Sequence, residues 1–163
     1  MLIKIPAANN RKAEGEKVGH ALVRARTSTL RINEIFYSLQ GESSRVGLPT
    51  VFVRLTGCPL RCGYCDTAYA FNDGKILLLD DIIDEVAQYK TNYVCVTGGE
   101  PLARRDLELL VARARERALY VNLITSGVPL DKARFASLVR AGVEHVQVSF
   151  QDAFAASSDE IGG

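Results

Sequence analysis

The chain has 163 residues, of which 47% are hydrophobic and 24% charged, and its net charge is +1. This is the composition of an ordinary soluble globular domain, and such a balanced charge offers no basic field to attract nucleic acid. No apolar run is long enough to cross a bilayer, and residues 1–30 lack the apolar stretch of a secretory signal. We therefore expect a cytoplasmic protein with neither nucleic-acid nor membrane partners, with residues 1–30 as a disordered leader and an ordered domain over 31–163.

Apolar strands alternate with amphipathic helices along this domain. The stretch "TVFVRLTG" (50–57) is rich in β-branched residues and ends at a glycine, which is typical of a buried strand. The same reasoning predicts strands over 30–39, 50–57, 93–101, 120–127 and 145–152, and helices over 77–90, 104–118 and 130–142. Near-continuous apolar strands separated by helices predict an α/β fold, with a parallel sheet covered by helices.

The chemically distinctive segments all follow strand ends. The cysteine-rich loop "CPLRCGYCDT" (58–67) follows the strand over 50–57, and "TGGEP" closes the strand over 93–101. "TSG" and "SFQD" close the next two strands. In α/β sheets and barrels, the carboxyl ends of the strands form the functional edge, so we expect these segments to meet there.

The cysteine loop has the spacing C-x3-C-x2-C, formed by Cys58, Cys62 and Cys65. Without a secretory signal, clustered cysteines favour metal binding over disulfides. Three thiolates could hold an iron–sulfur cluster or supply three of four zinc ligands. Neither His20 nor His145 lies nearby in sequence as a fourth zinc ligand, and mid-strand Cys95 is typical of a buried, inert thiol. Three ligands without a fourth favour a cluster that leaves one iron open for a small molecule.

The cysteine loop, with "TGGEP" one βα unit later, resembles the radical S-adenosylmethionine superfamily. The resemblance implies a partial (βα) barrel of the radical SAM type, here truncated after about four core parallel strands where the superfamily usually has six βα units. It also implies a 4Fe-4S cluster on the three cysteines, with S-adenosylmethionine at the open iron. The cofactor-binding residues implied by position are Tyr64, Cys65, Asp66, Gly99, Ser126 and Ser149.

Residues 31–102 resemble 7-carboxy-7-deazaguanine synthase of queuosine biosynthesis, through "INEIFYSLQGE", "GLPTVFVRLTGCPLRCGYCDTAYAF" and "YVCVTGGEPLA". This family is a carbon–nitrogen lyase that converts 6-carboxy-5,6,7,8-tetrahydropterin to 7-carboxy-7-deazaguanine with loss of ammonia. The resemblance implies a flavodoxin or ferredoxin as reductant, a homodimer, and no catalytic residue beyond the cluster and cofactor. It implies that Arg54 pairs with the substrate carboxylate and that Thr67 binds Mg2+. The other implied substrate-binding residues are Leu39, Gln40, Gly41 and Thr97.

From about residue 103 the resemblance changes to the radical enzyme that modifies the precursor peptide in pyrroloquinoline quinone biosynthesis. The deazaguanine family carries Glu-Thr-(Asn/Ser)-Gly on the third strand, where this chain has "LITSG" (123–127). After the fourth strand that family has a "PK" segment, where this chain has "SFQD" (149–152). The sequence thus predicts a family switch near 103. The alternative functions are a peptide-modifying radical enzyme and an inactive cluster-binding fragment.

Overall fold

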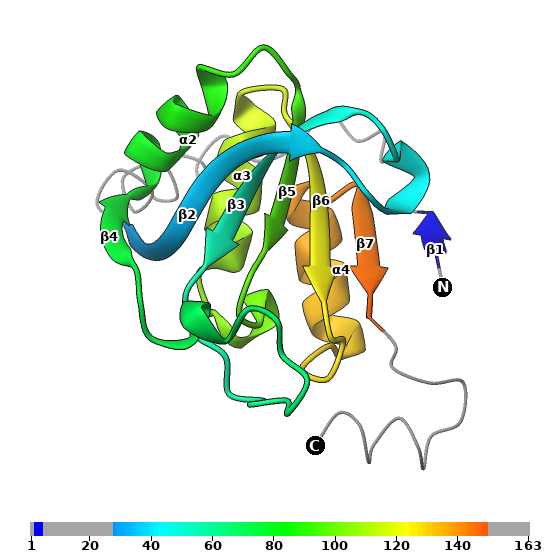
Figure 1. Cartoon of the computed structure of the whole chain (residues 1–163). Coiled ribbons are helices and arrows are strands. Elements are labelled where there is room, and N and C mark those ends of the chain that lie inside the picture. The colour runs from blue at the N-terminus through cyan, green and yellow to red at the C-terminus, as the bar shows by residue number, and fades with distance from the viewer. Residues whose placement is uncertain (1, 5–27, 150–163) are drawn as a thin grey trace.

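The computed structural model describes residues 2–4 and 28–149, whose strands form one sheet with helices on one face (Figure 1). Within these residues the sheet has seven strands in the order β1-β7-β6-β5-β3-β2-β4. The strands are β1 (Leu2–Lys4), β2 (Thr29–Leu39), β3 (Pro49–Leu55), β4 (Lys75–Leu78), β5 (Tyr93–Thr97), β6 (Tyr120–Thr125) and β7 (His145–Val148). The α-helices are α2 (Leu79–Ala87), α3 (Leu107–Glu116) and α4 (Lys132–Ala141).

Four strands form the parallel centre of the sheet. β3 pairs with β5, β5 with β6, and β6 with β7, each in parallel. The predicted set of four core parallel strands and the α/β class are therefore confirmed. Alternate side chains, such as Val53, Val96 and Leu123, are almost fully buried and form the core under the helices. This alternation explains why the strands are so rich in valine.

At the edge of the sheet that contains β2 and β4, the strands pair antiparallel, which the sequence did not predict. β2 pairs antiparallel with both β3 and β4. The predicted helix over 77–90 starts too early, because Leu77 and Leu78 extend β4 opposite Leu30 and Thr29. α2 begins only at Leu79. Its first turn contains two acidic residues, whose negative charges interact favourably with the positive end of the helix dipole.

Two further boundaries differ from the prediction. Residues 101–103 form a short 3-10 turn and Arg104 is extended, so α3 begins at Leu107 rather than at 104. Leu2–Lys4 lie in a strand that pairs antiparallel with β7, and β2 begins at Thr29. The division into a disordered leader over 1–30 and a domain over 31–163 stays a prediction. Residues 5–27, and the last three residues of the strand predicted over 145–152, lie outside the described residues.

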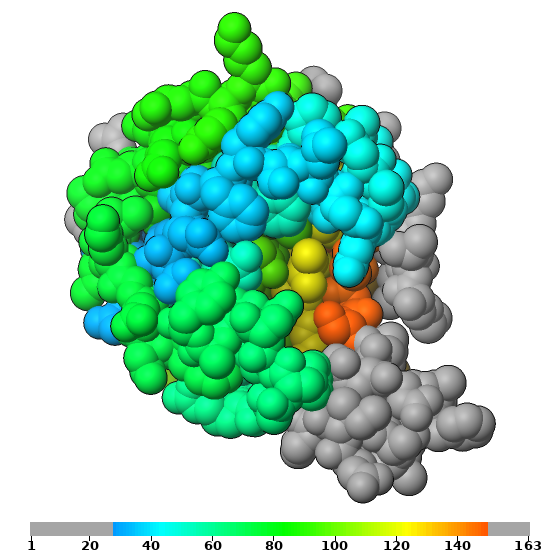
Figure 2. Space-filling view, in the orientation of Figure 1, coloured from blue at the N-terminus to red at the C-terminus, as the bar shows by residue number. Residues whose placement is uncertain are grey.

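None of the described α-helices covers the opposite face of the sheet, and we call it the helix-free face. Its side chains include Arg54, Thr97, Ile124 and Gln147, which the strand register places side by side. Figure 2 shows this face at the bottom of a hollow, with parts of β6 and β7 visible between the β2 hairpin and the cysteine loop. None of the helices in the described part of the chain is long and apolar enough to cross a membrane.

Candidate active site

The cysteine loop leaves β3 through Gly57, whose φ of +104° suits a residue without Cβ. Its turn is closed by the amide of Cys65, which donates to the carbonyl of Cys62 at 3.2 Å. The guanidinium carbon of Arg61 lies 4.3 Å from the centroid of the Phe71 ring, so a cation–π contact holds the far side of the loop. Cys58, Cys62 and Cys65 are all half-buried and free of disulfides.

The cysteine loop and the ends of β3, β5, β6 and β7 enclose a cavity of about 190 Å³. The strand ends meet here as the parallel topology requires. Eleven of the residues singled out in the sequence line this cavity: Arg54, Cys58, Cys62, Tyr64, Cys65, Asp66, Thr67, Thr97, Gly99, Ser126 and Ser149. Leu39, Gln40 and Gly41 do not line it; they end β2 and begin the β2–β3 loop.

The two glycines of "TGGEP" are required by the protein's own backbone. Gly98 and Gly99 have φ of +78° and +52°, in the left-handed region that favours glycine. A Cβ on Gly99 would lie 2.1 Å from the carbonyl oxygen of Gly57, at the start of the cysteine loop. The amide of Glu100 donates to that same carbonyl at 3.0 Å. The absence of side chains therefore lets the β5 turn lie directly against the cysteine loop.

Glu100 is a site residue that the sequence reasoning missed. Its side chain is buried at 2% exposure. Its Oε1 accepts from the Leu102 amide at 2.8 Å and the Thr125 hydroxyl at 2.6 Å. Its Oε2 accepts from the amide and the hydroxyl of Ser126, at 2.9 and 2.6 Å. Four hydrogen bonds compensate the buried carboxylate and join the ends of β5 and β6. The sequence signal that could have identified Glu100 was an acidic residue directly after two glycines at the end of a strand.

This arrangement also limits what Ser126 can offer a ligand. Its hydroxyl donates to Glu100 and accepts from the Val128 amide at 3.3 Å. Since a serine hydroxyl has one proton to donate, only its remaining lone pair is free to accept from a ligand in the cavity.

Arg54 enters the cavity from β3 in a polar network. Its Nε donates to Glu34 Oε1 at 2.7 Å, and its NH1 lies 3.4 Å from the Thr67 hydroxyl. The Thr67 hydroxyl itself donates to Asp66 Oδ1 at 2.7 Å. The guanidinium carbon also lies 5.4 and 5.7 Å from the ring centroids of Phe36 and Tyr69, within cation–π distance of both. This network holds the guanidinium in a fixed orientation at the edge of the cavity.

Gln40 lies deeper on the helix-free face. Its side chain is buried, and its Oε1 accepts from the Glu42 amide at 3.3 Å. Its amide also hydrogen-bonds the thiol of Cys95 on β5. Burial is the main reason that the pKa of Cys95 rises to about 11, so this thiol stays protonated and inert, as expected.

The three loop cysteines are a suitable donor set for an iron–sulfur cluster. They are free thiols, half-buried, and all three line the same cavity. Thiolates are the usual ligands of such a cluster, and each binds a different iron. Within residues 2–4 and 28–149, no group of three or more His, Cys, Asp or Glu side chains forms a site for one metal ion.

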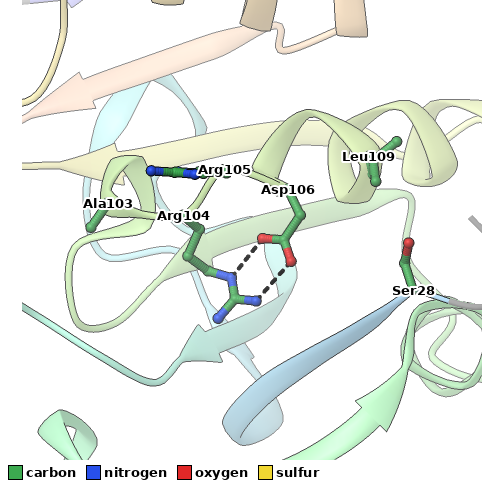
Figure 3. A pocket seen from close by; sticks show the side chains of 6 residues that line it. All are labelled: Ser28, Ala103, Arg104, Arg105, Asp106 and Leu109. Carbon is green, nitrogen blue, oxygen red and sulfur yellow. Dashed lines mark hydrogen bonds and ion pairs between the residues drawn. The ribbon is translucent and has the colours of Figure 1, made fainter. Parts of the chain in front are cut away.

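A second cavity of about 460 Å³ lies where Ser28 approaches the start of α3 (Figure 3). Arg104 binds Asp106 through two hydrogen bonds of 2.9 Å, so its charge is already paired. Arg105 is exposed, and in Figure 3 its side chain points away from Asp106. None of the six lining residues is a cysteine or a residue singled out in the sequence, so this cavity is separate from the candidate active site.

Residues 52–158 match the family described as the Radical SAM superfamily. This match covers more than half of the chain, and it includes the cysteine loop and the strand ends around the cavity. The chain belongs to the radical SAM superfamily, whose members use a 4Fe-4S cluster and S-adenosylmethionine.

Two groups of relatives narrow the similarity. The chain is 43% identical over 125 residues to the 7-carboxy-7-deazaguanine synthase of Hyperthermus butylicus, covering 75% of this chain and 52% of the relative. It is 43% identical over 110 residues to the PqqA peptide cyclase of Granulibacter bethesdensis, covering 65% of this chain and 29% of the relative. The chain thus spans about half or less of these relatives' length. Since the two alignments cover 75% and 65% of this chain, they must overlap over part of it.

A solved structure supports the fold. The crystal structure of QueE from Escherichia coli matches with a TM-score of 0.59 and 27% sequence identity, over 66% of this chain and 57% of that one. The similarity confirms the predicted radical SAM type of α/β fold.

Proposed function

We propose that the chain is a radical S-adenosylmethionine enzyme of the 7-carboxy-7-deazaguanine synthase type. It would convert 6-carboxy-5,6,7,8-tetrahydropterin to 7-carboxy-7-deazaguanine with loss of ammonia. The observation that carries this proposal is the position of Arg54, a fixed guanidinium that borders the same cavity as the three cysteines. A guanidinium suits the carboxylate of such a substrate, because it can donate two parallel hydrogen bonds.

The residues around the cavity divide into two groups in this proposal. Cys58, Cys62 and Cys65 would hold the cluster, which supplies the reducing electron for cleavage of S-adenosylmethionine. The cofactor would be contacted by Tyr64, Cys65, Asp66, Gly99, Ser126 and Ser149. Arg54 and Thr97 would hold the substrate from the strand ends, and Leu39–Gly41 would border it from the β2–β3 loop.

Thr67 would contribute to a Mg2+ site. Its hydroxyl oxygen lies 2.7 Å from Asp66 Oδ1, so two hard oxygen ligands of the kind that Mg2+ prefers already lie together at the cavity. Binding the cation would require Thr67 to turn its proton away from Asp66. The oxygen that now accepts from Arg54 would then face the metal.

A second candidate function is that of a peptide-modifying radical enzyme. It is favoured by the equal identity to a PqqA peptide cyclase and by Ile124, an apolar residue that lines the cavity within the "LITSG" segment. In keeping with the predicted change of resemblance, we propose that a family switch lies near residue 103. It would join a deazaguanine-type cysteine loop to strands of the other type.

The experiment is anaerobic reconstitution with iron and sulfide, followed by an assay for 5′-deoxyadenosine with S-adenosylmethionine and dithionite. The assay is run alone, with the tetrahydropterin, and with a precursor peptide that bears Glu and Tyr. Cys62→Ala and Cys95→Ala form a matched pair, since each removes one thiol. We expect the first to abolish cluster absorbance and the second to retain it.

The outcomes separate the candidates. Tetrahydropterin-dependent formation of 7-carboxy-7-deazaguanine supports the proposal, and modification of the peptide instead replaces it with the second function. A cluster without 5′-deoxyadenosine identifies an inactive cluster-binding fragment. One equivalent of tightly bound zinc in place of iron contradicts all three.

A further inference from the structure

Three polar side chains continue the helix-free face below the candidate active site. Asn122 on β6 lies beside His145 on β7, and Gln147 lies beside Ile124 in the same register. Ile124 lies two residues after Asn122, and Ser149 lies two residues after Gln147. Both line the cavity between the strand ends and the cysteine loop. Asn122, His145 and Gln147, which we call the polar floor, therefore extend inward from that cavity.

Unsatisfied hydrogen-bonding atoms are concentrated on this floor. In the described part of the chain, five buried side-chain nitrogen or oxygen atoms have no hydrogen-bond partner. Three are Asn122 Oδ1, His145 Nε2 and Gln147 Oε1, and a fourth is the Nε of nearby Arg45. The fifth, Arg134 Nε, has a carboxylate oxygen of Glu108 at 3.1 Å. Because unpartnered buried polar atoms are rare and costly, such a cluster indicates a missing polar ligand.

The free atoms define the chemistry of that ligand. Asn122 and His145 are only 4% and 5% exposed. The Asn122 amide nitrogen already donates to the thiol of Cys95, and that of Gln147 donates to Glu42, so the carbonyl oxygen is the polar atom of each side chain that has no partner. Burial, and then the positive charge of Arg45, lower the pKa of His145 and keep its ring neutral. The two unpartnered amide oxygens are acceptors without charge, and they suit neutral N–H donors.

A loop covers the inner end of the floor. The loop between β2 and β3 crosses the sheet, and Arg45 places its guanidinium 5.4 and 4.6 Å from the ring centroids of Tyr93 and Tyr120. The hydrogen bond from Gln147 to Glu42 also holds the loop against the sheet. Gly41 and Gly47 flank this cover, and neither has an atom within 4 Å of the position of a Cβ. Backbone hydrogen bonds from Gln40 to Leu48 and from Gly47 to Gln40 close the loop, so it would move as one unit to admit a ligand.

We infer that the polar floor is a substrate subsite, in which the Oδ1 of Asn122 and the Oε1 of Gln147 accept hydrogen bonds from the N–H edge of a planar heterocycle. The subsite rests on the proposed function for its position beside the substrate carboxylate. Arg54 holds that carboxylate at the cavity, and the floor holds the donor-bearing ring further in. Gln40, which contacts Cys95 on the same face, borders the ring from the covering loop.

The test compares two probes of the same bicyclic shape, both with a carboxylate on the pyrazine ring. Pterin-6-carboxylate has the N–H edge, and quinoxaline-2-carboxylate lacks it. Dissociation constants are measured anaerobically by calorimetry on reconstituted protein with S-adenosylmethionine. We expect Gln147→Met and Asn122→Leu each to weaken the pterin about tenfold and to leave the quinoxaline unchanged. Gln88→Met, the same change on an exposed residue at the end of α2, should affect neither probe.

Gln147 is only half-buried, so its replacement by Met tests the inference even if the Asn122 variant misfolds. A thermal melt checks that each variant is folded. The inference is overturned if both probes bind the parent protein equally, if both weaken equally in Gln147→Met, or if neither binds. Floor-dependent pterin binding without turnover supports the subsite and contradicts the proposed function. Turnover of the tetrahydropterin, with a pterin affinity that the floor variants leave unchanged, supports the proposed function and contradicts the subsite.

Discussion

Glu34 and Arg54 are direct partners across the antiparallel strands β2 and β3, and their side chains form an ion pair with Arg54 Nε 2.7 Å from Glu34 Oε1. Among the described residues, the NH2 group of Arg54 has no hydrogen-bond partner, and NH1 has only the Thr67 hydroxyl at 3.4 Å. Glu34 thus both orients the guanidinium and offsets its charge. The affinity of the site for a carboxylate depends on that balance.

Glu34→Gln should tighten carboxylate binding. The amide oxygen can still accept from Arg54 Nε, but the positive charge is no longer offset. Because the pair is 18% and 42% exposed, solvent screens the effect, and we expect about a threefold lower dissociation constant for quinoxaline-2-carboxylate. Asp84→Asn, which removes the charge from the exposed pair with Arg117, is the control and should leave binding unchanged. Weaker binding in Glu34→Gln would show that the charge of Glu34 contributes more to orientation than to screening.

Gly99→Ala should destabilise the protein strongly. The new Cβ would meet the Gly57 carbonyl oxygen at 2.1 Å, and the backbone has a φ of +52°. We expect a loss of about 3 kcal/mol in the free energy of unfolding, measured by urea denaturation. Gly63→Ala in the cysteine loop is the matched control, since a Cβ there meets nothing within 4 Å. Its loss should stay within about 0.5 kcal/mol. Equal losses would contradict the close approach of the β5 turn to the cysteine loop.

The four cysteines should differ in reactivity. In the metal-free protein at pH 8, iodoacetamide should modify Cys58, Cys62 and Cys65, which are half-buried. Cys95 should react only after denaturation, because its pKa of about 11 leaves almost no thiolate and the side chain is fully buried. Peptide mapping by mass spectrometry checks this, and reconstitution with the cluster should protect the three loop cysteines. Modification of Cys95 in the native protein would contradict its placement.

Stability should fall on mild acidification because of His145. Burial, followed by the charge of Arg45, lowers the pKa of the folded imidazole below its ordinary value of 6.5. The unfolded chain therefore binds a proton more readily, so this contribution to stability is complete above pH 6.5 and declines as the pH falls below it. Urea denaturation at several pH values between 7.5 and 5.5 should show this decline. His145→Gln should flatten it, and identical slopes for the two proteins would contradict a buried neutral imidazole.

Local patterns were sufficient to predict the parallel strands and the cysteine loop. Valines alternate along β3 and β5, and glycine follows each of these two strands within two residues, so residues near in sequence carried the information. The start of α2 was mispredicted because Leu77 and Leu78 continue an apolar run into the helix. Only their pairing with β2, more than 40 residues earlier, makes them a strand.

The site contacts show the same division. The role of Glu100 depends on Thr125 and Ser126, which lie 25 and 26 residues away, and no local pattern reports such partners. The polar floor had a weak signal in the sequence. Asn122 alternates with apolar residues in β6, as His145 and Gln147 do in β7, which indicates a strand face that is not simply core.

Glu100 also determines how the rim of the cavity can move. One carboxylate receives hydrogen bonds from the turn after β5 and from the end of β6, so separating these two segments would strand a buried charge without partners. The two segments are therefore expected to move together as one rigid unit at the rim of the cavity. A displacement that shifts Gly99 must carry Ser126 with it, so opening of the site requires a segment other than these two to move.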